Sequence, residues 1–216
     1  MGRKPVEAPV SNVVSNVLRW QLARFVVEAG IVRVSTDFLF PHRNGGFAPI
    51  YFDFRLVQSI PWLRDLVTSM LEDIVRPLMP HGIAGVQTGI VPVSILVSDR
   101  LDIPHYGVRK DPKKGDLPWI DGEDPRGKSL VLLEDVITSG TSVRNALKRL
   151  RDCRANILAC GCIFAYHVAR VKDILPNTFA LITLDDFEGP MKDAGMVDDV
   201  SWGKIIRWRD GQLAGA

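Results

Sequence analysis

Two adjacent carboxylates followed by a turn rich in hydroxyl groups form the part of the chain best suited to chemistry. Residues 129–135, SLVLLED, have the apolar run of a buried strand and end in Glu134 and Asp135. The segment VRNALKRL, further on, repeats apolar side chains at helical spacing, so we expect a helix with Ser142 as its N-cap. The turn between them contains Thr138, Ser139, Gly140, Thr141 and Ser142.

This arrangement suits a phosphate monoester bound at the start of a helix. The first N–H groups of a helix lack helical acceptors, and the macrodipole is positive at that end. Gly140 lets the backbone approach a ligand closely. Glu134 and Asp135 would lie at the carboxyl end of the strand, where paired carboxylates can hold sugar hydroxyls near a divalent cation. No GxxxxGK[ST] or GxGxxG pattern is present here, which excludes a Walker loop and a dinucleotide fingerprint.

Strands that alternate with helices are expected to position this turn. The expected strands are IAGVQTG, HYGVRK, SLVLLED, NILACGCIFAYHV and TFALITLDD, and the helices between them include VPVSILVSDRL, SVRNALKRLRD and one before the last strand. This order predicts an α/β fold with a central parallel sheet flanked by helices on both faces. The tail, GKIIRWRDGQLAGA, is expected to be short and poorly ordered at its end.

The first part of the chain predicts a small subdomain. Residues 12–29 carry apolar side chains at spacings of three and four, and Gly30 follows as a C-terminal cap would, which predicts a helix. The runs IVRVS and IYFDFR predict two strands joined across a turn-rich loop. Residues 61–79 predict a second amphipathic helix that begins at Pro61. We therefore expect an N-terminal hood over residues 1–58 and an α/β core over residues 59–216.

EDVITSGTS resembles the signature with which type I phosphoribosyltransferases bind phosphoribosyl pyrophosphate (PRPP), and the wider resemblance covers roughly residues 12–190. It implies that the turn binds the 5-phosphate and that the acidic pair binds the ribose hydroxyls, with Mg²⁺ bridging pyrophosphate and ribose. Asp135 is implied as catalytic. The PRPP-binding residues implied by this signature are Glu134, Asp135, Val136, Ile137, Thr138, Ser139, Gly140, Thr141 and Ser142.

Two further segments resemble the orotate phosphoribosyltransferase branch of that family. GVQTGIVP is similar to its pyrophosphate loop, which implies that Thr88 and Gly89 bind the diphosphate. YGVRKDPKKG is similar to the start of its flexible catalytic loop. That similarity implies that Arg109, Lys110 and Lys113 bind pyrophosphate and that the two lysines are catalytic.

The segment 109–127 is longer than most structureless loops, and loops of this length are often lids. Cations in such a lid can neutralise a leaving diphosphate, and its closure excludes water from the transition state. A solvated charged loop is the alternative interpretation. We favour the lid because the PRPP signature accompanies it.

The base end of the site is inferred from two segments. FPHRNGGFAPIYFDFR resembles the FxLKSGxxSPxYF segment of the orotate branch, which implies base contacts by Arg43, Tyr51 and Phe52 in addition to Thr138; ordinary strand residues are the alternative. The branch places an Arg after the next strand, whereas this chain has AYHVAR, with His167 nearest in register. The usual His after the second loop Lys is also missing. A buried carboxylate without a cation is costly, so an acceptor other than orotate stays open.

Composition excludes several other classes. The 216 residues suit one large domain, or one domain with a small appendage. An apolar fraction of 46% and a charged fraction of 24% are typical of soluble proteins, and no apolar run is long enough for a membrane helix. The formal net charge of +2 gives little support for nucleic-acid binding. The start of the chain lacks a secretory signal pattern, so we expect a cytoplasmic protein.

Three cysteines, Cys153, Cys160 and Cys162, fit a reducing compartment, and their odd number argues against a closed disulfide framework. Cys160 and Cys162 share a face of an expected strand and are interpreted as buried structural residues. A two-ligand metal fragment is the alternative, but no second Cys or His pair supports it.

These features predict an enzyme that joins PRPP to a pyrimidine base, with orotate as the leading candidate, using Mg²⁺ near Glu134 and Asp135. Uracil or a purine as the acceptor is the first alternative. A PRPP-sensing regulator is the second, although no helix-turn-helix segment or basic stripe supports it. The expected partners are PRPP and a nucleobase, without nucleic acid or membrane. The resemblance also implies a homodimer in which loop 109–127 reaches the neighbouring subunit's site.

Overall fold

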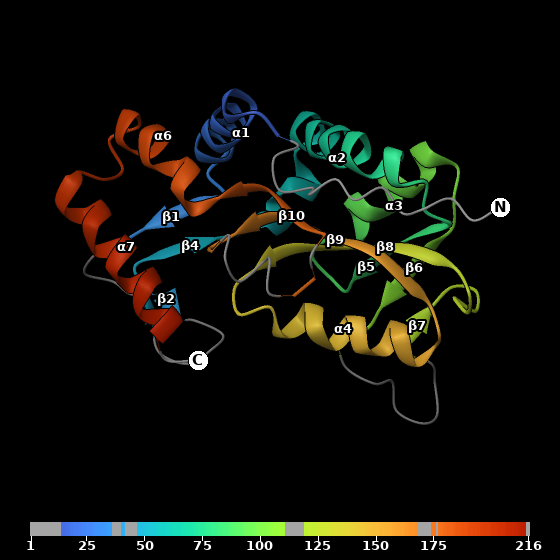
Figure 1. Ribbon diagram of the computed structural model, residues 1–216. Coiled ribbons are helices and arrows are strands. Elements are labelled where there is room, and N and C mark those ends of the chain that lie inside the picture. The colour runs from blue at the N-terminus through green and yellow to red at the C-terminus, as the bar shows by residue number, and fades with distance from the viewer. Residues whose placement is uncertain are drawn as a thin grey trace.

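The computed structural model describes residues 14–35, 40–41, 47–110, 119–167, 174–175 and 177–214 (Figure 1). Its centre is a six-stranded sheet in the order β10-β9-β8-β5-β6-β7. The strands are β5 (Gly82–Val86), β6 (His105–Val108), β7 (Ile120–Asp121), β8 (Ser129–Ile137), β9 (Asn156–Ala165) and β10 (Thr178–Thr183).

Neighbouring strands of this sheet run parallel except for β6 and β7, which pair antiparallel. The sheet is therefore mostly parallel, and the predicted α/β class is confirmed. Strand β7 lies inside segment 109–127, which the sequence interpretation treated as one structureless loop. That interpretation is corrected for residues 120–121, because Val108 pairs with Ile120 and Gly107 with Asp121 and together they extend the edge of the sheet.

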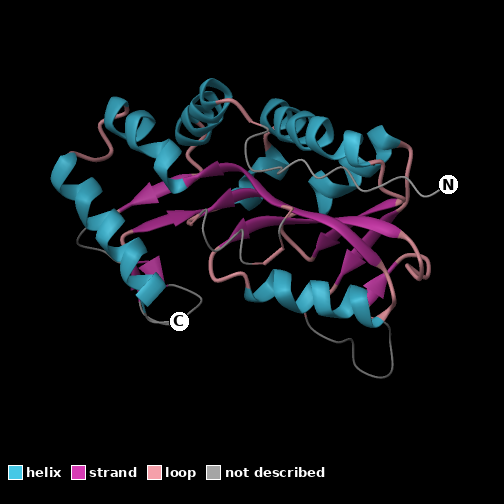
Figure 2. Ribbon diagram, viewed as in Figure 1, coloured by secondary structure: helices cyan, strands magenta, loops and turns pink. Residues whose placement is uncertain are grey.

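Helices cover both faces of the sheet (Figure 2). On one side lie α2 (Pro61–Val75), which continues as the short 3₁₀ helix η3 (Arg76–Leu78), and α3 (Val91–Leu101); on the other lies α4 (Thr141–Asp152). Strand β8 shows why both faces are needed. Val131 and Leu133 pack in the apolar cluster that contains the α2 and α3 side chains, whereas Leu130 and Leu132 pack with α4. Successive strand residues point to opposite faces, so an uninterrupted apolar run requires a helix on each side.

The N-terminal part contains the predicted helix and strand pair. Helix α1 (Asn16–Glu28) is capped by Ser15, whose hydroxyl accepts from the Leu18 N–H, and Gly30 follows it with a φ of +67°. Strand β1 (Val32–Val34) pairs antiparallel with β4 (Ile50–Phe52). A second small pair joins β2 (Phe40–Pro41) to β3 (Phe47–Ala48), and the 3₁₀ helix η2 (Phe54–Ser59) leads into the core.

The C-terminal region is helical, whereas the sequence interpretation treated residues 203–216 as a short tail. After η4 (Leu184–Phe187) and α6 (Glu188–Asp193), helix α7 (Asp199–Ala214) runs beside the N-terminal strands (Figure 1). Trp202 and Ile205 are buried in the same apolar cluster as α1, and the Trp208 indole donates to the Phe47 carbonyl at 3.0 Å. The helix forms because these side chains have an apolar surface to cover, which short-range sequence patterns do not reveal.

The division into a hood and a core at residue 58 stays a prediction. The helix expected between β9 and β10 falls largely outside the described residues. Within the described part of the chain, no helix combines the length and apolar character that a membrane crossing requires.

Candidate functional site

The hydroxyl-rich turn connects the carboxyl end of β8 to the start of α4. Gly140, not Ser142, occupies the N-cap position, so the predicted cap is corrected. Its φ of +76° is left-handed, a conformation that glycine adopts without strain, and an added Cβ would lie 2.8 Å from Ile174. Because glycine has no capping side chain, the first amides of α4 are left for a ligand. The Ser139 and Thr141 hydroxyls are hydrogen bonded at 3.0 Å.

The acidic pair ends up in two different environments. The Glu134 side chain is 1% exposed, and within the described residues its Oε2 has no hydrogen-bond partner. Asp135 is half-buried, and its Oδ1 accepts from the Val136 N–H at 2.9 Å. Burial, followed by the hydrogen bond and charge of Asp135, raises the pKa of Glu134 well above its usual value, while Lys110 opposes the rise. The ammonium of Lys110 lies 3.8 Å from Glu134 Oε2.

The predicted pyrophosphate loop directly abuts this pair. It follows β5, contains a cis peptide bond between Gln87 and Thr88, and leads into α3. A Cβ built at Gly89 would lie 1.9 Å from Asp135 Oδ2, so only a glycine allows the loop to approach the carboxylate this closely. The amide of Gln58 donates to the Gly89 carbonyl at 3.0 Å. The fold thus brings together segments that lie more than forty residues apart in the sequence.

Arg109 and Lys110 follow the end of β6, and Lys110 reaches the acidic pair. The Arg109 guanidinium binds the Asp121 carboxylate, with Nε at 3.1 Å from Oδ1. The other oxygen of Asp121 accepts from the Gln87 amide at 2.7 Å. Asp121 therefore joins the two predicted pyrophosphate segments, a role that sequence reasoning missed because no local pattern links residues this far apart. Lys113 lies outside the described residues.

Adjacent aromatic residues of β4 have different surroundings. Tyr51 is half-buried, its ring lies 5.2 Å from the Arg33 guanidinium, and its hydroxyl accepts from Arg55 at 3.0 Å. Phe52 is 6% exposed and its ring packs against those of Phe54, Phe164, Tyr166 and Phe187. The structure therefore assigns Phe52 to the core rather than to base stacking, because successive strand residues point to opposite faces.

Thr138 and His167, both predicted to contact the base, follow two neighbouring strands of the sheet. His167 follows β9, and its Nε2 lies 2.9 Å from the backbone carbonyl of Arg209 in α7. Thr138 lies in the turn after β8, half-buried beside the acidic pair. Ile137 is 1% exposed, so only its backbone is available to a ligand, whereas Val136 is half-buried. Arg43 lies outside the described residues.

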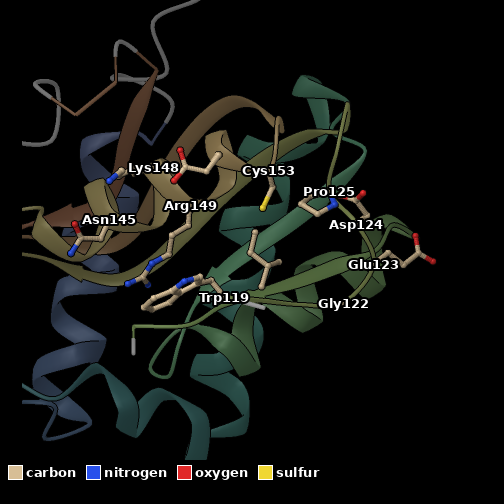
Figure 3. Close-up of a pocket in the computed structure, with 11 residues that line it drawn as sticks. Trp119, Gly122, Glu123, Asp124, Pro125, Asn145, Lys148, Arg149 and Cys153 are labelled. Atoms are coloured by element: carbon tan, nitrogen blue, oxygen red, sulfur yellow. The ribbon is translucent and has the colours of Figure 1, made fainter. Parts of the chain in front are cut away.

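A hollow of about 740 Å³ lies between the second half of α4 and the segment that contains β7 (Figure 3). None of its lining residues was singled out as a site residue from the sequence, and the most prominent contact in it is the Arg149 guanidinium, 3.7 Å from the centre of the Trp119 ring. Its walls are formed by Trp119, Ile120, Gly122, Glu123, Asp124, Pro125, Asn145, Lys148, Arg149, Asp152 and Cys153.

The cysteines behave as structural residues. Cys160 and Cys162 are fully buried in β9, and burial raises the pKa of both thiols. Among the residues that the structure describes, no group of three or more His, Cys, Asp or Glu side chains could hold a metal ion by itself. The strand interpretation of these cysteines is confirmed.

Comparison with known proteins agrees with this geometry. Residues 60–191 match the family model of the phosphoribosyl transferase domain. Orotate phosphoribosyltransferase of Lactobacillus johnsonii is 33% identical over 156 residues, which cover 71% of this chain and 74% of that protein. Orotate phosphoribosyltransferase of Bacillus cereus strain G9842 is 29% identical over 199 residues, covering 89% and 95%.

The fold is also found in a solved structure, that of orotate phosphoribosyltransferase from Aeropyrum pernix. It superposes with a TM-score of 0.70 at 21% identity and covers 82% of this chain and 99% of that one. The matched region of the family model includes the acidic pair, the glycine-containing turn and the loop that faces them. The chain therefore belongs to the phosphoribosyltransferase family.

Proposed function

We propose that this protein transfers the phosphoribosyl group of PRPP to orotate, giving orotidine 5'-monophosphate and pyrophosphate. The observation that carries the proposal is the approach of Gly89 to Asp135, because it places a candidate diphosphate loop against a candidate ribose-binding pair. The turn that follows the pair supplies amides for the 5-phosphate. Relatives named orotate phosphoribosyltransferase, at about the same length, support the choice of acceptor.

Each segment then has a role in the reaction. The amides and hydroxyls of residues 138–142 hold the 5-phosphate, and Glu134 and Asp135 hold the ribose hydroxyls. Lys110, together with Arg109, stabilises the negative charge that develops on the leaving pyrophosphate. Lys113 is proposed as a second catalytic cation, and segment 109–127 as the lid that carries it.

Mg²⁺ fits this arrangement. Magnesium in nucleotide enzymes is typically held by one or two carboxylates together with substrate phosphates, so a complete protein ligand set is not needed. Asp135 directs Oδ2 toward the diphosphate loop, and Glu134 Oε2 lacks a hydrogen bond within the described residues. When bound, the ion would offset the charge of the diphosphate and polarise the bond that breaks.

The acceptor is proposed to bind at Tyr51, Thr138, His167 and Arg43. The Tyr51 side chain is half-buried, whereas that of Phe52 is buried in the core. Orotate carries a carboxylate that needs a cation or several donors, and Arg43 is the candidate for that contact.

The direct test is orotate consumption by the purified protein with PRPP and Mg²⁺, compared with uracil, adenine and hypoxanthine as acceptors. We expect turnover with orotate and a loss of about 10²- to 10³-fold in Asp135→Asn, the order seen when one charge-stabilising group is removed. Asp73→Asn, at an exposed carboxylate of α2, is the control and should retain turnover. Turnover with another base alone would move the proposal to that base, and PRPP binding without any turnover would favour a PRPP sensor.

We further propose a cytoplasmic homodimer in which segment 109–127 contributes to the neighbouring subunit's site. Mixing Lys113→Ala chains with Asp135→Asn chains should restore part of the turnover, because some hybrid dimers would contain one intact site. No restoration, or sedimentation as a monomer at micromolar concentration, would contradict the shared site.

A further inference from the structure

Arg149 lies in the second half of α4. It contacts the chain just after β6 and just before β7. Its guanidinium donates to the carbonyls of Arg109 and Lys110, with Nη2 at 2.9 Å from the Lys110 oxygen. The face of the same guanidinium lies 3.7 Å from the centre of the Trp119 ring (Figure 3). One side chain therefore holds the described chain at residue 110, where β6 has ended, and at residue 119, where β7 is about to begin.

Backbone and side-chain bonds reinforce this junction. The Arg109 N–H donates to the Trp119 carbonyl at 2.9 Å, and the Arg109 guanidinium binds Asp121. Lys110 is left to extend toward the acidic pair, where its ammonium lies 3.8 Å from Glu134 Oε2. The position of that ammonium thus depends on the two carbonyls that Arg149 holds.

Arginine suits this task better than lysine would. Its planar group offers several fixed donors in its plane and a flat face for an aromatic ring, whereas an ammonium offers three donors at a single point. The helix that carries Arg149 begins at the phosphate turn, roughly 12 Å away at 1.5 Å per residue. Arg149 therefore does not need to touch the 5-phosphate in order to relate the turn to Lys110, because both lie on or against one rigid helix.

We propose that Arg149 is a positioning residue that holds Lys110 in register with the phosphate turn, an inference that rests on the proposed pyrophosphate role of Lys110. Its function would be to keep the ammonium where a diphosphate bound beside Gly89 and Asp135 can meet it. Nothing in the local sequence singles out Arg149 from its neighbours Lys148 and Arg151.

The test uses calorimetric titration of the full chain with pyrophosphate in the presence of Mg²⁺, and separately with ribose 5-phosphate, which needs only the turn and the acidic pair. We expect Arg149→Met to weaken pyrophosphate binding about tenfold, the order of one charge-assisted contact. Ribose 5-phosphate binding should change by less than about twofold, since the turn is untouched. Arg149→Lys should recover only part of the loss, because it cannot make both carbonyl contacts and the stack.

A double-mutant cycle with Lys110→Ala distinguishes positioning from a general structural role. If Arg149 acts through Lys110, the double variant binds pyrophosphate no more weakly than Lys110→Ala alone. Additive losses, or an equal loss of ribose 5-phosphate binding in Arg149→Met, would overturn the inference. Arg151→Met, on the exposed side of the same helix, is the matched control and should bind both ligands like the wild type.

The outcomes separate this inference from the proposed function. A wild-type protein that binds pyrophosphate and ribose 5-phosphate but leaves orotate unchanged would refute the orotate reaction. The binding of pyrophosphate and of ribose 5-phosphate to the variants would still test the positioning role of Arg149. A wild-type protein that binds neither ligand would refute both.

Discussion

The phosphate end of the proposed site comes mainly from one continuous stretch of chain, whereas the base end is assembled from segments far apart in the sequence. At the phosphate end, residues 134–142 supply the carboxylates, the turn and the first turn of α4. At the base end, β4 supplies Tyr51, and His167 follows β9 by two residues. Helix α7 packs over both regions through Trp208 and Arg209. Phe47 and Trp208, joined by one hydrogen bond there, are 161 residues apart.

This difference predicts how substitutions at the two ends of the site will affect activity. The phosphate end depends on close approaches of backbone to carboxylate, where a single methyl group has no room. The base end depends on aromatic packing and single hydrogen bonds between elements, which can adjust. We therefore expect substitutions at the phosphate end to abolish PRPP chemistry and substitutions at the base end to alter the affinity for the acceptor.

Gly89→Ala should have a larger effect than any substitution at the base end. The added Cβ would lie 1.9 Å from Asp135 Oδ2, so the loop or the carboxylate must move, and a shift of about 1 Å in a reacting site can cost 10²-fold. We expect kcat/KM for PRPP to fall by about that factor. Gly211→Ala in α7, where an added Cβ meets nothing within 4 Å, is the control and should leave kcat/KM unchanged. Equal kcat/KM in the two variants would show that the close approach of Gly89 to Asp135 does not matter for catalysis.

Trp208→Phe should have an intermediate effect confined to the base end. The indole donates to the Phe47 carbonyl and its ring lies edge-on to Tyr166, and phenylalanine keeps the ring without the donor. Loss of one hydrogen bond is worth about 1 kcal/mol, so we expect KM for orotate to rise about fivefold. Steady-state kinetics should show KM for PRPP within about twofold of wild type. If both KM values rise together, the two ends do not act separately.

Glu134→Gln should raise thermal stability slightly, with a distinctive dependence on pH. A carboxyl with a raised folded-state pKa binds its proton more tightly when folded, so stability falls as pH rises from its usual pKa of 4.5 toward the folded value. The glutamine side chain carries no charge, so the variant does not lose stability by burying a carboxylate at neutral pH. We expect the Tm at neutral pH to rise by about 2–4 °C, the shift typical of small stability gains in a chain of this size.

The advantage of Glu134→Gln should disappear below pH 4.5, where the wild-type carboxyl is protonated in both the folded and unfolded states. Thermal unfolding at several pH values measures this, with exposed Glu123→Gln as the comparison. A Tm difference that persisted unchanged at low pH would show that charge burial is not its cause. The same variant should lose PRPP turnover, since the buried carboxylate is retained for its ligand and not for stability.

The sequence by itself determined the α/β class, five of the six central strands and the strand–turn–helix unit around EDVITSGTS. These follow from apolar periodicity and turn chemistry within about ten residues, which act wherever the rest of the chain lies. Even there the cap was misplaced, because Gly140 and not a hydroxyl side chain starts α4.

Only the tertiary structure decided the rest. It left Tyr51 half-buried and placed Phe52 in the core, turned the expected tail into α7, and formed β7 within a segment predicted to be a loop. It also joined Gln87 to Asp121 and Arg149 to Arg109, which are 34 and 40 residues apart. The physical reason is that these contacts gain their free energy from surfaces and donors on other elements, so no pattern within the local sequence encodes them.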